Sequence, residues 1–342
     1  MGNISFNQVS IVEQYSEELS RSNVNVGVDM GKFFMKLPVF SANMPQITET
    51  SMAVCMYKNG GRGILHRDCS IDKNVEMFIN AVAKTELTDP YCVGVSIGVQ
   101  EEDRQRFLSL YEAGARLFCI DVAHGHHILV KKMIQWIKEQ DEDVYLIAGN
   151  VAREEGARDL AEWGVSAIKC GIGPGSVCAT RKNTGVGTPQ FSAIQNAKKG
   201  LKKHPNVKII ADGGIKNAGD IPKAIAAGAD VVMIGAILAG TTETPGKVFP
   251  RPDTDLWNRQ YYKVYGGSAS GENKVAGGKE HKFVEGIMKT VPFKGKAKYI
   301  LQEIIDGLRS CFSYTGAKDM ETFKKKVKFE IMEASGIAES KL

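Results

Sequence analysis

Several familiar sequence features are missing from this chain of 342 residues. No stretch reaches the ~18 consecutive apolar residues that a membrane-spanning helix needs, so we expect no membrane partner. No basic stripe is present either, because the 44 basic residues are scattered and nearly balanced by 39 acidic ones. The formal net charge of +5 therefore argues against a nucleic-acid partner and suits a small anionic ligand.

The cysteines lack the spacing of a disulfide framework. None of the seven forms a CxxC pair, and Cys92 and Cys119 lie inside apolar runs. The first residues also lack a basic segment followed by an apolar one, so we expect no secretion signal. Together these absences predict a reducing compartment and a cytoplasmic protein.

A GxGxxG motif is missing from the first strand-helix unit, which argues against a doubly wound dinucleotide-binding sheet. What the chain does have is eight short apolar runs, which lie at residues 37–40, 63–66, 92–99, 116–125, 144–150, 166–173, 207–214 and 230–235. Segments with helical apolar spacing separate many of them, at residues 74–84, 104–114, 129–140, 154–164 and 220–229. Strand and helix in alternation predict a parallel sheet. We predict a single α/β domain, a (β/α)8 TIM barrel over residues 1–342; the doubly wound sheet is the alternative.

Residues 246–295 interrupt this alternation. The segment is polar, rich in glycine and poorly periodic. We expect a long loop without regular structure that acts as a flap or lid over the barrel mouth. A surface insertion without a function is the alternative.

Glycine-rich sequence follows several predicted strands, where the active face of a (β/α) barrel lies. The glycines of DGGI (212–215) and MIGAIL (233–238) predict backbone N–H groups that approach a phosphate, with plain turn glycines as the alternative. Asp212 is suited to accept hydrogen bonds from ribose hydroxyls, and Asp121 to orient a ligand. The loop that contains Asp121 also carries His124, His126 and His127, but no acidic or cysteine partner completes a metal-ligand spacing.

Cys178 lies in the glycine-rich loop KCGIGPGSVCATRKNTGVG, residues 169–187. A single cysteine is more often inert than reactive. Here the neighbouring Ser176, Thr180 and Arg181 predict a partly exposed, polar site near positive charge, which favours the thiolate. We therefore interpret Cys178 as a nucleophile.

The motifs PVFSANMPQITE, ILHR, IDVAHGH, IAGNVAREEGARDL, GIGPGSVC, IADGGI, VVMIG and VEGIMKTVPFKG together resemble the IMP dehydrogenase and GMP reductase family. The resemblance covers nearly the whole chain. It implies a barrel that binds a purine nucleoside monophosphate, GMP or IMP, a loop cysteine that attacks C2 of the base, and a homotetramer.

The resemblance also bears on the branch of the family. Dehydrogenases of the family normally carry inserted CBS modules and an Arg-Tyr pair on a mobile flap that activates water. No inserted domain is recognisable here, and residues 270–290 contain neither arginine nor tyrosine. The RKNTGVG run, Thr180 and Glu285 match the reductase pattern, in which a hydroxyl and a carboxyl protonate departing ammonia. The expected activity is NADPH-dependent reductive deamination of GMP to IMP.

Residue roles follow by carry-over from the resemblance. Cys178, Thr180 and Glu285 would be catalytic. The contacts to the nucleotide would come from Ser176, Asp212, Gly213, Gly214, Gly235, Tyr265, Gly267 and Ser268. Arg67, Asp121 and Asn150 would face the nicotinamide, and carbonyls of Gly173, Gly175 and Cys178 would hold a monovalent cation such as K⁺. A dehydrogenase without CBS modules and a catalytically silent nucleotide-binding barrel are the alternatives.

Overall fold

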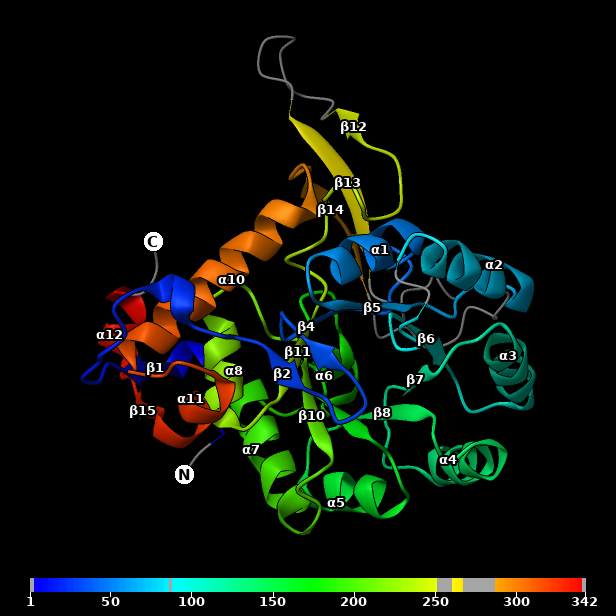
Figure 1. Ribbon diagram of the computed structural model, residues 1–342, viewed down its shortest axis with the longest axis horizontal. Helices are drawn as coiled ribbons and strands as arrows, with labels where there is room; N and C mark the ends of the chain where they lie inside the picture. The colour runs from blue at the N-terminus through cyan, green and yellow to red at the C-terminus, as the bar shows by residue number, and fades with distance from the viewer. Residues whose placement is uncertain (1–2, 86–87, 251–259, 267–286, 340–342) are drawn as a thin grey trace.

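A closed barrel of eight parallel strands forms the centre of the protein (Figure 1). The computed structural model describes residues 3–85, 88–250, 260–266 and 287–339. The barrel strands are β4 (Val39–Ser41), β5 (Arg62–Leu65), β6 (Val93–Ile97), β7 (Leu117–Asp121), β8 (Tyr145–Val151), β9 (Ala167–Cys170), β10 (Lys208–Asp212) and β11 (Val231–Ile234), with β11 closing onto β4. Each of the eight predicted apolar runs contains or overlaps one of these strands, so the (β/α)8 prediction is confirmed.

The strands form continuous apolar runs because both of their faces are buried. Strands β5, β6, β9 and β11 are buried at every position. One face packs inside the barrel and the other lies under the helices, which is the usual situation of a parallel sheet.

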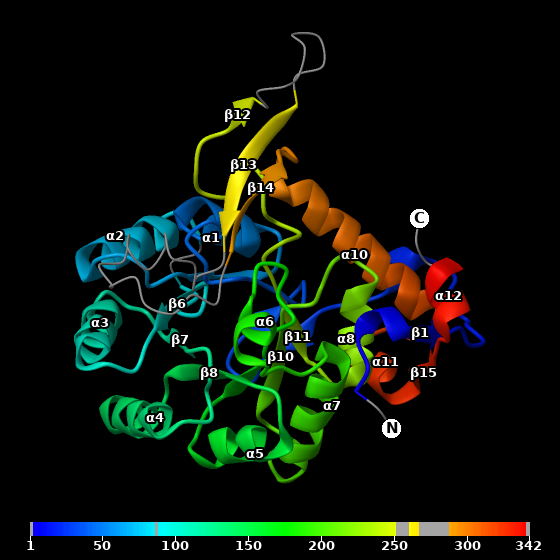
Figure 2. The ribbon, with the colours of Figure 1, turned by 180° about the vertical axis from the view of Figure 1, so that it is seen from behind.

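Helices cover the outside of the barrel (Figures 1 and 2). They are α1 (Thr50–Lys58), α2 (Ile71–Val82), α3 (Glu101–Glu112), α4 (Ile128–Gln140), α5 (Glu154–Glu162), α7 (Gln190–Gly200), α8 (Asp220–Ala227) and α10 (Ala297–Tyr314). Helix α2 illustrates why they form: the Ser70 side chain accepts from Lys73 N–H at its start, and Met77, Phe78 and Ala81 bury one face. Helix α10 packs against both α8 and α1 and completes the ring.

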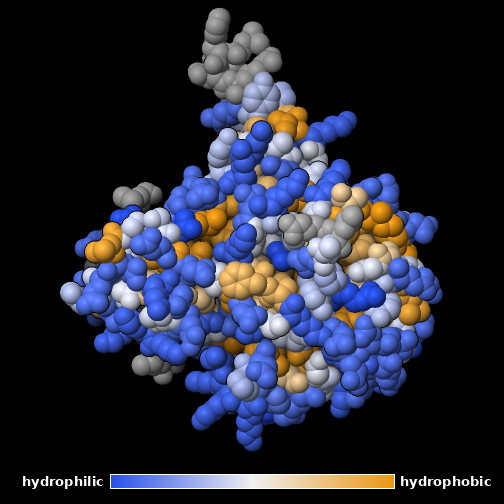
Figure 3. All heavy atoms as spheres, in the orientation of Figure 1, coloured by the Kyte–Doolittle hydropathy of each residue, from blue (hydrophilic) through white to orange (hydrophobic). Residues whose placement is uncertain are grey.

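Shorter elements surround this ring. Strand β1 (Val9–Val12) pairs antiparallel with β15 (Lys328–Ile331), so the two ends of the described chain lie side by side. The others are β2 (Val28–Asp29), β3 (Phe34–Met35), α6 (Thr180–Thr184), α11 (Met320–Lys326), α12 (Ala334–Glu339) and the 3₁₀ helices η1 (Phe6–Gln8), η2 (Arg21–Asn23) and η3 (Leu201–Lys203). Polar residues cover much of the face in Figure 3. None of the described helices has the length and apolarity to cross a bilayer.

A three-stranded antiparallel sheet projects from the barrel (Figure 1, yellow to orange). It consists of β12 (Phe249–Pro250), β13 (Tyr261–Gly266) and β14 (Met288–Pro292). The expectation that residues 246–295 lack regular structure is therefore wrong for the described part of this segment. In YYKVYG, Tyr261 and Val264 are exposed while Lys263 and Tyr265 are buried, a mixed pattern too short to stand out in the sequence. Its proposed action as a lid remains a prediction.

Candidate active site

A cavity of about 380 Å³ opens at the carboxyl ends of the barrel strands. Every described residue that the sequence predicted for the site lines it: Arg67, Asp121, Asn150, Gly173, Gly175, Ser176, Cys178, Thr180, Asp212, Gly213, Gly214, Gly235 and Tyr265. Gly267, Ser268 and Glu285 lie outside the described residues. The size suits a small-molecule ligand.

Cys178 projects from the loop between β9 and α6. Its side chain is exposed, and its thiol donates to Thr180 Oγ1 over 3.1 Å. The Cys178 N–H donates to the Gly175 carbonyl over 3.1 Å, which closes a tight turn just before the thiol. A cysteine and a hydroxyl are thereby held together at the mouth of the cavity.

We call residues 171–188 the cysteine loop. Arg181 ties its two ends together, because its side chain lies between Gly173 and Gly187. A Cβ at Gly173 would come within 2.5 Å of Arg181 Cγ, and one at Gly187 within 2.4 Å. The Arg181 guanidinium donates to the Thr188 carbonyl over 2.5 Å. Gly173 also has a φ of +82°, which other residues rarely adopt. The glycines thus provide the space that the arginine occupies.

Backbone-exposing turns follow β10 and β11. Gly213 and Gly214 have φ of +86° and +80°, and a Cβ at Gly235 would lie 3.3 Å from the Tyr265 hydroxyl. Tyr265 hydrogen-bonds with Ser176, and burial raises the pKa of its phenol. The phenol therefore stays neutral and able to donate at physiological pH. These N–H and O–H groups form a surface suited to an anionic group.

Four side chains at the strand ends form what we call the charge cluster: Lys169, Asp121, Asp212 and Asn150. Lys169 Nζ lies 2.7 Å from Asp121 Oδ1 and 2.7 Å from Asp212 Oδ2. Asn150 Nδ2 also donates to Asp212 Oδ2, over 2.8 Å. Burial acts to lower the pKa of Lys169, but the two carboxylates outweigh it and raise that pKa. Burial acts to raise the pKa of Asp121, but Lys169 outweighs it, so the carboxyl stays ionised.

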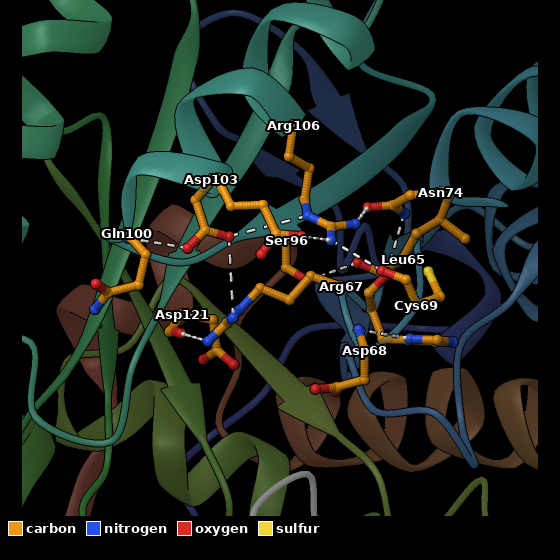
Figure 4. A network of polar contacts seen from close by, with 12 residues as sticks. Leu65, Arg67, Asp68, Cys69, Asn74, Ser96, Gln100, Asp103, Arg106 and Asp121 are labelled. Atoms are coloured by element: carbon orange, nitrogen blue, oxygen red, sulfur yellow. Dashed lines mark hydrogen bonds and ion pairs between the residues drawn. The ribbon is translucent and has the colours of Figure 1, made fainter. Parts of the chain in front are cut away.

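Arg67 lies on the side of the cavity next to Asp121. Its Nη2 donates to the Asp121 carbonyl over 3.1 Å, and its Nη1 lies 4.0 Å from Asp103 on α3. Figure 4 shows the guanidinium between these two aspartates, with the buried Arg106 on the far side of Asp103. Gly98 leaves room for this pairing, since a Cβ there would come within 2.3 Å of Asp103 Oδ2.

The three histidines of the Asp121 loop do not line the cavity. His126 Nε2 lies 2.8 Å from Asp159 Oδ2 on α5, and His127 caps α4. Among the described residues no group of three or more His, Cys, Asp or Glu side chains could hold a metal ion.

A family model described as "IMP dehydrogenase / GMP reductase domain" matches residues 3–342. The chain belongs to the IMP dehydrogenase/GMP reductase family. Enzymes of this family are oxidoreductases that use a nicotinamide cofactor. The family resemblance predicted from the sequence is therefore confirmed.

Relatives of both branches match the chain. Inosine-5'-monophosphate dehydrogenase from Cryptosporidium parvum is 35% identical over 386 residues, which cover 98% of this chain and 94% of that protein. GMP reductase from Leishmania major is 41% identical over 254 residues, which cover 72% of this chain and 51% of that protein. The match thus spans about half the length of the Leishmania relative.

A solved structure of the same family superposes over the whole chain. It is a cysteine-to-alanine variant of GMP reductase from Trypanosoma brucei in complex with guanosine 5'-monophosphate. The TM-score is 0.90 at 26% identity, covering 100% of this chain and 98% of that chain.

Sequence reasoning missed a central residue of the cavity, Lys169. The residue lies inside the apolar run SAIKCGIG rather than on a loop. A lysine is almost never fully buried without a partner, so its place in a buried strand was a usable signal.

Proposed function

We propose that the protein is a GMP reductase that converts GMP to IMP and ammonia with NADPH. The observation that carries the proposal is the contact between the exposed Cys178 thiol and Thr180 Oγ1 in a cavity suited to a nucleotide. The flap sequence adds support, because residues 270–290 contain no arginine or tyrosine to activate water. Without such a group a covalent intermediate at C2 would not be hydrolysed quickly.

The chemistry would run in two halves through one adduct. The Cys178 thiolate adds to C2 of GMP. The Thr180 and Glu285 pair then delivers a proton to the 2-amino group. The C–N bond breaks and ammonia departs, so that a thioimidate between Cys178 and C2 remains. When bound, the reduced nicotinamide supplies a hydride to C2. The C–S bond then breaks and the electron pair returns to sulfur, which releases IMP.

Glu285 lies outside the described residues, but the chain just after it touches the cysteine loop. The Ile287 N–H donates to the Val177 carbonyl over 3.1 Å, next to Cys178. This contact supports both the role of Glu285 and the action of residues 246–295 as a lid. In this proposal Gly267 and Ser268 of the same segment contact the base.

Nucleotide binding would divide between the turns and the charge cluster. Backbone groups of Gly213, Gly214 and Gly235 would contact the phosphate, together with the hydroxyls of Ser176 and Tyr265. Asp212 would accept hydrogen bonds from the ribose.

The residues present fit a nicotinamide cofactor. Asn150 Oδ1 is buried and has no hydrogen-bond partner among the described residues, so it can accept from a carboxamide or hydroxyl. Arg67 donates to the Asp121 carbonyl, and the Asn150 N–H donates to the carbonyl of Val122, the residue after Asp121. We assign Asn150, Asp121 and Arg67 to the cofactor, with NADPH as the expected form.

A monovalent cation and a homotetramer complete the proposal. Carbonyls of Gly173, Gly175 and Cys178 would hold the cation, and the Gly175 carbonyl already accepts the Cys178 N–H. Comparing turnover in potassium and lithium salts tests the cation. Light scattering tests the tetramer, and fractionation tests the cytoplasmic location.

A dehydrogenase that oxidises IMP with NAD⁺ is the second candidate. It is favoured by the Cryptosporidium parvum relative, 94% of whose length aligns with this chain. The branches are separated by following nicotinamide absorbance with GMP plus NADPH in one reaction and IMP plus NAD⁺ in another. Consumption of NADPH with IMP and ammonia formed in equal amounts supports the reductase. Formation of NADH with XMP would overturn it. No change in absorbance in either reaction would favour a catalytically silent nucleotide-binding protein.

A further inference from the structure

We infer that Lys169 is a positioning residue that orients two carboxylates for two different ligands, Asp212 for the nucleotide ribose and Asp121 for the nicotinamide cofactor. The inference rests on the proposed function for the roles of the two aspartates. The position and contacts of Lys169 are given by the structure alone.

The strand register explains how one side chain reaches both acids. Asp121 on β7 pairs with Gly149 on β8, and Gly149 pairs with Lys169 on β9, so the three residues lie in one row. Gly149 carries no side chain between its neighbours. A Cβ there would lie 2.7 Å from Lys169 Cβ and 2.4 Å from the Lys169 carbonyl oxygen. The gap lets the lysine cross β8 to reach Asp121, while Asp212 follows on the adjacent strand β10.

The contacts determine which oxygens remain for ligands. Lys169 and Asn150 both donate to Asp212 Oδ2, so Oδ1 is left to accept from a ribose hydroxyl. Lys169 binds Asp121 through Oδ1, and the Asn43 side chain also hydrogen-bonds to this carboxylate, so the carboxylate that would face the cofactor is held from two sides. Fixing one oxygen of each carboxylate thus sets the direction of the other.

The charge balance makes the lysine hard to replace. Its side chain is 4% exposed, and those of Asp121 and Asp212 are 25% and 21% exposed. Removing the ammonium would leave two neighbouring carboxylates facing each other in a poorly hydrated site, with Arg67 reaching only the Asp121 side. The pair would then share a proton or move apart, and either response weakens both ligand contacts.

The test uses Lys169→Met and Lys169→Gln, which remove the charge, and Lys169→Arg, which keeps it. Asp212→Asn and Asp121→Asn serve as single-site references. Lys208→Met is the matched control, because Lys208 lies at the opposite end of the neighbouring strand β10. Calorimetric titration measures the Kd of GMP and, separately, of NADP⁺, so no turnover is needed.

We expect the neutral variants to raise both Kd values by about tenfold or more, as for the loss of charged hydrogen bonds. Asp212→Asn should raise mainly the Kd of GMP, and Asp121→Asn mainly that of NADP⁺. Lys169→Arg should recover most of both affinities, and Lys208→Met should leave both unchanged.

Two results would overturn the inference: a lower melting temperature with both Kd values unchanged, or a loss confined to one ligand. If the neutral variants do not fold, Lys169→Arg provides the test. Because its altered geometry acts on both carboxylates, any change in affinity should appear in both Kd values, and a change confined to one ligand would overturn the inference. The same titrations with IMP and NAD⁺ separate this inference from the proposed function. A protein that binds only that pair would refute the reductase, while the effect of Lys169 on two ligands would still be measured.

Discussion

The charge cluster and the cysteine loop line the same cavity but are held in place differently. Lys169 is buried in a barrel strand between its acidic partners. Cys178 is exposed on a loop, where its thiol contacts Thr180 and its N–H closes a turn. The relative positions of the cluster residues are set by strand register. The loop depends on glycines and on Arg181.

This difference in structural support corresponds to a division of roles, with ligand binding at the charge cluster and the covalent reaction at the cysteine loop. Groups that orient a ligand benefit from a fixed geometry on rigid elements. A nucleophile that forms and breaks a bond needs access and some freedom, which a loop provides. Changes in the loop should therefore lower turnover while affinity persists, and changes at the strand ends should act first on affinity.

The largest effect is expected for Cys178→Ala. Removing the sulfur removes the covalent route, so kcat should fall by at least ~10³-fold. GMP should still bind with a Kd within about threefold of the original, because none of the proposed phosphate and ribose contacts involves the thiol. Initial rates and calorimetry check this. Cys311→Ala on α10 is the control and should turn over normally; retained turnover in Cys178→Ala would exclude the covalent mechanism.

A smaller effect is expected for Arg181→Ala. The loss of the side chain between Gly173 and Gly187 should let the cysteine loop shift and lower kcat by about 10- to 100-fold, as for a displacement of about 1 Å. The Kd of GMP should change little. Lys182→Ala, on the exposed surface of α6, is the matched control. A change in the Kd of GMP with kcat intact would mean that the cysteine loop, and not the charge cluster alone, determines affinity.

Asp103→Asn tests how Arg67 is held at the strand-end side of the cavity. Asparagine can still accept the hydrogen bond that the Gln100 N–H donates to Asp103 Oδ2. It loses the charge that faces Arg67 and Arg106. The KM for the cofactor should rise about three- to tenfold, while the Kd of GMP stays the same. Glu102→Gln, on the exposed side of the same helix, is the control. Equal losses for both ligands would mean that Asp103 supports the whole cavity rather than Arg67.

The sequence predicted the barrel because buried parallel strands give continuous apolar runs, and eight were visible. It predicted site residues because they lie at the carboxyl ends of the strands, as Asp121 and Asp212 do at the last positions of β7 and β10. It did not predict helices α1 and α7. Helix α1 buries only Met52, Ala53 and Met56, and α7 is buried continuously over residues 190–194, so neither shows a clear three- to four-residue period. The antiparallel sheet of β13 and β14 was also missed, since its pairing joins segments far apart in the chain.

Lys169 could not be assigned from spacing. Its partners lie on β7 and β10, and their convergence depends on the register of four neighbouring strands and on an absent side chain at Gly149. The sequence contains the lysine as an anomaly in an apolar run, but only the three-dimensional arrangement shows which acids neutralise it.

The smallest effect is expected for His126→Asn, which tests whether the outer end of the Asp121 loop contributes to activity. Asp121 begins this loop inside the cavity, whereas His126 faces Asp159 on the outside. A partly exposed ion pair contributes about 0–1 kcal/mol, so the free energy of unfolding should change little and kcat should stay within about twofold. Denaturation curves and initial rates, with and without a metal chelator, provide the measurement. A large loss of turnover, or inhibition by the chelator, would mean that the histidines act in catalysis and that the reactive region extends beyond the cavity.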